Sequence, residues 1–229
     1  MLGEPEKQLS LTRAEIARRA QKQLLISFVM VLGLAGSLAS ASQLLFESTQ
    51  MGPANAPGGL SISSAQFLGA RFHLSSGAVI DGVGGHLFGA GGGNGLIFGA
   101  VIKLTSLTDV PDSADFTTPD VLAKTTFQVP AGPSADISAP IGPIAVSPGD
   151  YAIVFASGLF GATGSAGAAD DNVPSEANAE RSLAYHVGSG FGWDLAGNSG
   201  LRFTVYAVPE PNAVLLLPVL AGRWLRRRR

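Results

Sequence analysis

The chain has 229 residues, of which 14% are charged, 30 are glycine and none is cysteine. A chain without cysteine cannot form disulfides, thiolate metal sites or a cysteine nucleophile, and it cannot carry the acylated cysteine of a bacterial lipoprotein. Its charge is unevenly placed, because residues 42–207 hold thirteen acidic residues against five basic ones, a net charge of −8, while both ends are basic. An acidic centre repels phosphate backbones, which argues against nucleic acid as a partner.

The first 41 residues have the pattern of a secretory signal peptide. A segment with three basic residues, 18–22, precedes an apolar run from Leu24 to Ala35 that is short for a membrane span. Ala39 and Ala41 provide the small-x-small pattern that signal peptidase cleaves, so we expect the mature chain to begin at Ser42. The alternatives are an uncleaved N-terminal anchor, because small and apolar residues continue to the end of this segment, and a buried helix.

Short runs with strand character follow a predicted linker. Residues 42–64 contain the stretch MGPANAPGGL and are predicted to form that linker. From residue 65 onward, runs rich in apolar and β-branched residues are each bounded by Gly, Pro or Asp, which is typical of strands. The predicted strands are Ala65–Leu74, Ala78–Gly89, Leu96–Thr105, Val121–Val129, Ile144–Val146, Asp150–Ser157, Ser182–Val187 and Leu201–Val208.

These runs predict an all-β fold. No stretch of the body shows a helical stripe longer than about two turns, and turn-rich joints favour antiparallel pairing. We expect a single β-sandwich of jelly-roll kind over residues 65–207, flanked by an N-terminal signal helix and a short C-terminal hydrophobic helix. The stretch GLFGATGSAG, residues 158–167, lacks the length of a collagen repeat and the Gly-Lys of a phosphate-binding loop, so it is predicted to be a flexible surface loop.

Asp170, Asp171 and Asn172 begin the densest group of side-chain oxygens in the body, which continues with Glu176 and Glu180. Calcium prefers such ligands, so the first three residues are weak calcium candidates. The spacing is not that of an EF-hand loop. The alternative is an ordinary solvated acidic loop.

An aromatic residue lies beside polar groups between the last two predicted strands. Phe191 and Trp193 precede Asp194, and Asn198 follows. A sugar ring can stack on an exposed aromatic side chain while amide and carboxylate groups bind its hydroxyls, so Trp193, Asp194 and Asn198 are candidate glycan contacts. The alternative is that Trp193 covers the edge of the sandwich.

The sequence contains no recognisable catalytic motif. It shows no ordered Ser/His/Asp set, no nucleophile elbow and no characteristic pair of carboxylates. Its three histidines, His73, His86 and His186, lie in predicted strands without metal-ligand spacing. We therefore predict that the protein is not an enzyme and binds no cofactor, and that its histidines form no metal site.

The last 22 residues, VPEPNAVLLLPVLAGRWLRRRR, form three consecutive parts. A proline-containing box, which forbids a regular helix or paired strand, consists of Val208, Pro209, Glu210 and Pro211. An apolar segment, Ala213–Leu225, follows it. The basic terminus consists of Arg226, Arg227, Arg228 and Arg229, and such a block resists translocation, so the tail is expected to stay on the cytoplasmic side.

This order of parts resembles the PEP-CTERM sorting signal of Gram-negative bacteria, and the resemblance covers residues 208–229. It implies that an integral-membrane exosortase recognises the box and removes the tail, and that the protein accompanies exopolysaccharide in a biofilm or floc. One departure is the length of the apolar segment, whose 13 residues are interrupted by Pro218 and Arg223. As a helix it would span about 20 Å, less than the roughly 30 Å hydrocarbon core, which favours transient retention over a permanent anchor. The alternative is a disordered basic tail on a soluble protein.

The sequence thus predicts an exported, non-enzymatic protein. Signal peptidase and exosortase are its expected processing partners, the inner membrane holds it transiently, and exopolysaccharide is a further candidate partner at the cell surface or in the extracellular matrix. Two alternatives stay open: a carbohydrate-binding module that uses the Phe191–Trp193 loop, and a secreted hydrolase.

Overall fold

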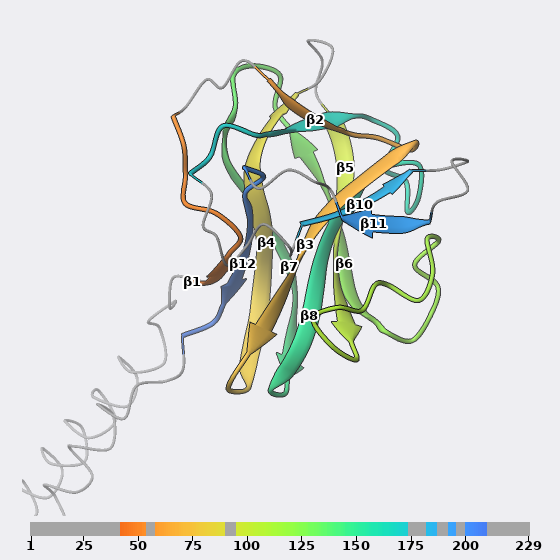
Figure 1. The fold of residues 1–229 in the computed structure, drawn as a ribbon. Coiled ribbons are helices and arrows are strands. Elements are labelled where there is room, and N and C mark those ends of the chain that lie inside the picture. Colours follow the sequence, from red (N-terminus) through yellow and green to blue (C-terminus); the bar gives the residue numbers. More distant parts are fainter. Residues whose placement is uncertain are drawn as a thin grey trace, which may run out of the picture. The chain divides into compact units, whose positions relative to one another are not determined.

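The computed structural model describes residues 42–53, 58–89, 95–173, 182–186, 192–195 and 200–209. Every regular element in these ranges is a strand, so the all-β prediction is confirmed for the described part of the chain (Figure 1). None of these residues belongs to a helix that could span a membrane. The predicted signal helix and C-terminal hydrophobic helix lie outside the described residues.

The strands form two antiparallel sheets. The first sheet contains, in spatial order, β1 (Gln43–Glu47), β12 (Phe203–Ala207), β4 (Ala78–Gly89), β9 (Ala166–Ala169) and β2 (Gly59–Ile62), with β7 (Ala135–Val146) on the other edge of β4. The second sheet contains, in spatial order, β11 (Trp193–Leu195), β10 (Ser182–His186), β3 (Gln66–Leu74), β8 (Gly149–Ala156), β5 (Gly95–Leu104) and β6 (Val121–Val129).

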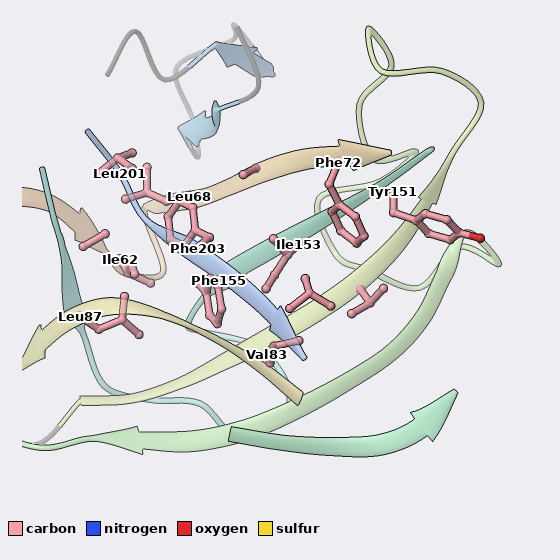
Figure 2. Packing of buried hydrophobic residues seen from close by; sticks show 14 of the residues in the cluster. Ile62, Leu68, Phe72, Val83, Leu87, Tyr151, Ile153, Phe155, Leu201 and Phe203 are labelled. Atoms are coloured by element: carbon pink, nitrogen blue, oxygen red, sulfur yellow. The ribbon is translucent and has the colours of Figure 1, made fainter. Parts of the chain in front are cut away.

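The two sheets face each other across one apolar core (Figure 2). Alternate residues of each strand point into it, because successive side chains of a strand point to opposite faces. Leu68 and Phe72 of β3 meet Val83 of β4 in this cluster. The ring of Phe155 on β8 stacks on that of Phe203 on β12 at a centroid distance of 5.4 Å, which joins the two sheets directly. The two sheets therefore form a sandwich-like arrangement.

The second sheet is buried on its outer face as well. A second apolar cluster covers that face and includes Phe98 of β5 and Val154 of β8. The loop between β5 and β6 contributes Phe116, and the turn after β8 contributes Ala162. Because both faces of β8 are covered, its sequence YAIVFA is apolar without alternation.

Each predicted strand corresponds to an observed one, but the structure also contains the short strand β11, between two predicted strands, and differs from the prediction in three other places. The prediction that residues 42–64 form a linker is wrong, because they contribute β1 and β2. Phe46 of β1 explains the difference, since its ring stacks on Phe72 of the core at 4.9 Å. With only five residues, and with Gln43 and Glu47 at its ends, β1 is too short a pattern for a strand to be recognised in the sequence.

The other two differences concern β9 and β7. The prediction of a surface loop over residues 158–167 is wrong at its end, where β9 is fully buried between β4 and β2. Gly167 lets the ring of Phe88 lie close to β9, because a Cβ atom would lie 2.1 Å from that ring and the ring would have to move. Strand β7 begins at Ala135 rather than Ile144. It tolerates Pro140 and Pro143 because it is an edge strand that pairs only with β4.

Candidate functional site

The first and last strands of the body are neighbours. Strands β1 and β12 pair antiparallel, with Gln43 opposite Ala207 and Leu44 opposite Tyr206. The start of β1 and the end of β12 therefore lie at the same end of the first sheet. The two positions at which we predict processing, before Ser42 and in the box that begins at Val208, flank this end. Of the other predicted processing residues, only Pro209 is described.

The ends of both strands are held by hydrogen bonds to β4. The backbone N–H of Val208 donates to the carbonyl oxygen of Val79 at 2.9 Å. The next residue, Pro209, has no N–H and cannot continue the ladder. On the neighbouring strand, the Ser42 hydroxyl donates to Asp81 Oδ2 at 2.7 Å. The predicted box thus begins where the paired backbone stops.

A surface pocket of about 300 Å³ lies between these ends. Its walls come from β1, from the turn between β3 and β4, and from the residues after β12; the lining residues are Gln43, Leu44, Leu45, Ser76, Gly77, Ala78, Ala207, Val208 and Pro209. Three large apolar side chains at this end, Leu44, Val79 and Val208, are 41%, 39% and 38% exposed. This end of the sheet therefore offers apolar surface beside the predicted box.

A buried arginine ties three strands together farther along the sheet. Arg202 is 4% exposed and precedes β12. Its Nε and Nη2 atoms donate to Glu47 Oε2 of β1 at 3.3 and 3.1 Å, and its Nη1 donates to Asp136 of β7. Both carboxylates are therefore bound to one guanidinium, which is the arrangement of a structural ion pair rather than of an acid and a base in a hydrolase.

Of the calcium candidates, Asn172 has a structural role. Its Oδ1 accepts hydrogen bonds from Gly52 N at 3.0 Å and from His86 Nδ1 at 2.7 Å. Its Nδ2 donates to the carbonyl oxygens of Ala169 at 2.9 Å and Gly200 at 2.7 Å. Both lone pairs of the amide oxygen are thus in use, so Asn172 could bind calcium only by losing at least one of these hydrogen bonds.

The neighbouring aspartates leave the calcium prediction open. Asp170 is exposed, whereas Oδ1 of Asp171 is shielded from solvent and has no hydrogen-bond partner. Glu176 and Glu180 lie outside the described residues. Among the residues that are described, no three His, Cys, Asp or Glu side chains are grouped so that they could hold a metal ion.

The histidines whose side chains are described lie on opposite outer faces of the sandwich. His73 of β3 is on the outer face of the second sheet, where Nδ1 contacts Asp150 Oδ1 at 2.7 Å. His86 of β4 is on the outer face of the first sheet and is fully buried. The two sheets separate these rings, so they cannot share a metal ion. The side chain of His186 is outside the described part.

Trp193 packs against the outer cluster of the second sheet. Its ring centroid lies 5.2 Å from that of Tyr185, 6.2 Å from Phe116 and 6.4 Å from Phe67. Its indole Nε1 is shielded from solvent and has no hydrogen-bond partner. This packing favours the alternative in which Trp193 covers the sheet. Asp194 is exposed beside it, while Phe191 and Asn198 are outside the described residues, so the glycan site stays a prediction.

The sequence did not single out Phe160, which is the aromatic residue most open to solvent among those described, at 38% exposure. It lies in the turn between β8 and β9 at a φ of 53°, a backbone conformation that is costly for a bulky residue. Lys124 Nζ lies 3.7 Å above its ring centroid. Because Phe160 occurs within a glycine-rich stretch, the sequence pattern gave no reason to distinguish it from an ordinary loop residue.

Comparison with known proteins adds no family. A scan against models of protein families finds no match to this chain, and a search of curated proteins finds none either. Function therefore rests on the residues of this chain and on their geometry.

Proposed function

We propose that the protein is exported, cut before Ser42 by signal peptidase and held at the inner membrane by a PEP-CTERM tail. An exosortase then acts at the box, and the body reaches the cell surface or the extracellular matrix, where exopolysaccharide is its candidate partner. The observation that carries this proposal is the pairing of Gln43 with Ala207, which brings both predicted processing positions to one end of one sheet.

This placement matters physically because both flanking signals are predicted to enter the same membrane. A body whose ends lay on opposite sides would have to be bridged by extra chain before both could insert. Here the chain leaves from adjacent strands, so neither signal needs a spacer. The exposed apolar side chains of Leu44, Val79 and Val208 lie at the same end of the sheet. An apolar surface there is suited to contact with lipid or with a membrane-embedded enzyme.

The polar groups that the structure brings together support a non-enzymatic body. Arg202 holds the carboxylates of Glu47 and Asp136, and Asn172 uses all of its hydrogen-bonding capacity on backbone groups and on His86. Each of these arrangements connects strands or loops, and none presents a nucleophile next to a base. We therefore assign the body a structural or binding role.

The jelly-roll kind of sandwich is part of the same proposal. Its support is the order β2-β9-β4-β7 in the first sheet and β3-β8-β5-β6 in the second. A jelly roll winds eight strands as two Greek keys, so that the chain passes repeatedly between the sheets. From β2 to β9 the chain changes sheet at every connection except that between β5 and β6. An experimental structure with β9 elsewhere than between β4 and β2 would contradict this assignment.

Intact-mass analysis of protein recovered from the host's extracellular matrix tests the export proposal. We expect the recovered chain to begin at Ser42 and to end within or next to Val208–Pro211. Changing the box by Pro209→Ala together with Pro211→Ala should leave the tail attached and the protein in the membrane fraction. Asp112→Asn, on an exposed loop of the body, is the matched control and should be processed normally. Full-length chain recovered from the cytosol would overturn the proposal.

Glycan binding is a second candidate function, and exposed Phe160 is the observation that favours it. The packed ring of Trp193 would have to leave three aromatic neighbours to stack on a sugar, whereas Phe160 is 38% exposed and its ring contacts one aromatic ring, that of Phe98, and the ammonium group of Lys124. Binding of the host's exopolysaccharide should then be weakened at least about tenfold by Phe160→Ala, the loss of roughly 1.4 kcal/mol. Leu122→Ala, on exposed β6 surface, is the control. Binding lost instead in a folded Trp193→Ala variant would restore the Trp193 site.

A further inference from the structure

Strand β4 contains a β-bulge at Asp81. The ladder with β12 pairs Ala207 with Ile80 and Tyr206 with Gly82, so it skips Asp81. The ladder with β7 skips the same residue, because Ile80 pairs with Ile144 and Gly82 with Pro140. A bulge re-aims the side chain of the extra residue. In this central strand, the bulge leaves Asp81 outside the regular pairing of both ladders.

The carboxylate of Asp81 is only half satisfied. Oδ2 accepts the hydrogen bond from the Ser42 hydroxyl, whereas Oδ1 is shielded from solvent and has no hydrogen-bond partner. Within the described part of the chain, no lysine, arginine or histidine forms an ion pair with Asp81. A shielded carboxylate oxygen without a hydrogen-bond donor is unfavourable. A cationic donor placed beside Oδ1 would therefore stabilise this carboxylate.

We propose that Asp81 is the binding site for the α-ammonium group that cleavage before Ser42 creates. This inference rests on the cleavage position of the proposed function. Hydrolysis breaks the Ala41–Ser42 peptide bond, and water supplies the hydroxyl of the new Ala41 carboxyl group and a hydrogen of the new Ser42 amine. At neutral pH the carboxyl group loses a proton and the amine binds one. A neutral amide with one N–H thus becomes a cation with three donors.

The new cation would form within reach of the carboxylate. Covalent geometry keeps the α-nitrogen of a serine within about 4 Å of its own Oγ, and the Oγ of Ser42 is already 2.7 Å from Asp81 Oδ2. Pairing of Gln43 with Ala207 fixes the next residue of the chain. Opposite the bulge, Tyr206 faces Gly82 from β12, and β7 contributes the uncharged Ile141, Gly142 and Pro143, which lie between Pro140 and Ile144. Asp81 is therefore the carboxylate that this ammonium meets.

The consequence is that the fold gains its full stability only after the leader has been removed during export. Among the described strands, β1 pairs only with β12, and it gains a charged link to β4 only after the leader is removed. The uncut chain lacks this link, so its first strand is held less tightly than that of the mature protein. Removal of the leader would in this way stabilise the same end of the sheet from which the sorting box leaves.

The test uses the full chain in detergent, with a site for a sequence-specific protease placed directly before Ser42. A matched chain carries the site one residue earlier, so that the cut protein begins at Ala41 and its amine is displaced by one residue. Intact mass confirms each start. The engineered cut does not depend on signal peptidase, so a failure of this inference is distinguishable from a failure of natural processing.

We expect the chain that begins at Ser42 to melt about 2–4 °C above the chain that begins at Ala41. The difference should vanish in Asp81→Asn. The Ser42 amine can be acetylated near pH 6.5, where lysines are protonated and unreactive. This should lower the melting temperature of the wild type to that of the chain that begins at Ala41. If Asp81→Asn does not fold, the acetylated protein tests the inference in its place. Equal melting temperatures for the two starts, or a difference that persists in folded Asp81→Asn, would overturn the inference.

Discussion

The outer faces of the two sheets are closed by opposite means. On the first sheet the buried groups are polar: His86, Arg202 and Thr204 are each at most 4% exposed, and the first two are held by Asn172 and by carboxylates. On the second sheet the covering groups are aromatic and aliphatic, centred on Phe116. Covering one face with hydrogen bonds and the other with apolar area gives the two faces different sensitivities to mutation, salt and pH.

The apolar face should give the largest effect. Phe116 is 1% exposed and its ring contacts those of Phe67, Phe98 and Trp193, so Phe116→Ala should lower the free energy of unfolding by about 3–5 kcal/mol. Chemical denaturation monitored by circular dichroism measures it. The exposed Leu122→Ala serves as control and should change stability by less than about 0.5 kcal/mol.

The backbone of Phe116 sharpens this prediction. Its φ of 55° lies in the left-handed region, which glycine adopts without strain. Phe116→Gly should therefore be less destabilising than Phe116→Ala by about 1 kcal/mol, although glycine removes more of the side chain. Glycine costing more than alanine at this position would show that the loop conformation is not strained.

The polar face should respond next most strongly at Asn172. Asn172→Ala removes an amide that serves two donors and two acceptors, and it leaves the buried His86 ring without its Nδ1 partner. We expect a loss of about 3 kcal/mol in the free energy of unfolding. Asp170→Asn, next to the same bend but exposed, is the matched control. If both variants lose a stabilisation that added Ca²⁺ confers on the wild type, the calcium prediction holds and the structural role assigned to Asn172 is incomplete.

The two faces also differ in how well the sequence predicted them. Strand β8 was recognisable because it is apolar throughout and buried on both faces, and β12 because apolar residues that face the core alternate with polar ones such as Thr204. Strand β9 was not, because AGAA has no bulky residue and is buried by its neighbours, such as Phe88, rather than by its own side chains. Short strands whose burial is decided by distant residues carry no local signal.

The candidate site shows the same limit. The box after β12 could be identified from consecutive residues alone. The meeting of Ser42 with Asp81, 39 residues away, could not, because the bulge that aims this carboxylate is visible only in the pairing of β4 with both of its neighbours. The packed state of Trp193 likewise depends on Phe67 and Phe116, which no spacing connects to it.

A smaller effect is expected at the ion pair of the polar face. Glu47→Gln leaves Arg202 with Asp136 as its remaining carboxylate, so the free energy of unfolding should fall by about 1–2 kcal/mol. Because the carboxylates are partly open to solvent, about 1 M salt should reduce the difference between variant and wild type. Phe116→Ala should keep its full effect in the same salt. An ion-pair difference insensitive to salt would mean that Glu47 acts through packing instead.

The smallest effect is expected at Asp109, a carboxylate in the β5–β6 loop that also carries Phe116. Thr105 donates its hydroxyl to Asp109 Oδ2 at 2.6 Å and its N–H to the same atom at 3.0 Å, and Val110 N donates to Oδ1 at 2.9 Å. These hydrogen bonds, with Arg71 nearby, lower the pKa of Asp109 below its ordinary value. A lowered pKa means that the stabilisation is complete above the unfolded-state pKa and is lost as the pH falls through the folded-state pKa.

Asp109→Asn should therefore cost about 0.5 kcal/mol at pH 7, and the difference from wild type should shrink as the pH falls below about 4. Thermal unfolding of both proteins between neutral and acidic pH measures this. Thr105→Val removes the hydroxyl donor and should reproduce part of the loss with the same pH dependence. If the difference in stability between Asp109→Asn and the wild type stays constant as the pH falls, the charge of Asp109 does not stabilise the loop. The stability of the loop would then depend on Phe116 alone, and the apolar face would not respond to pH.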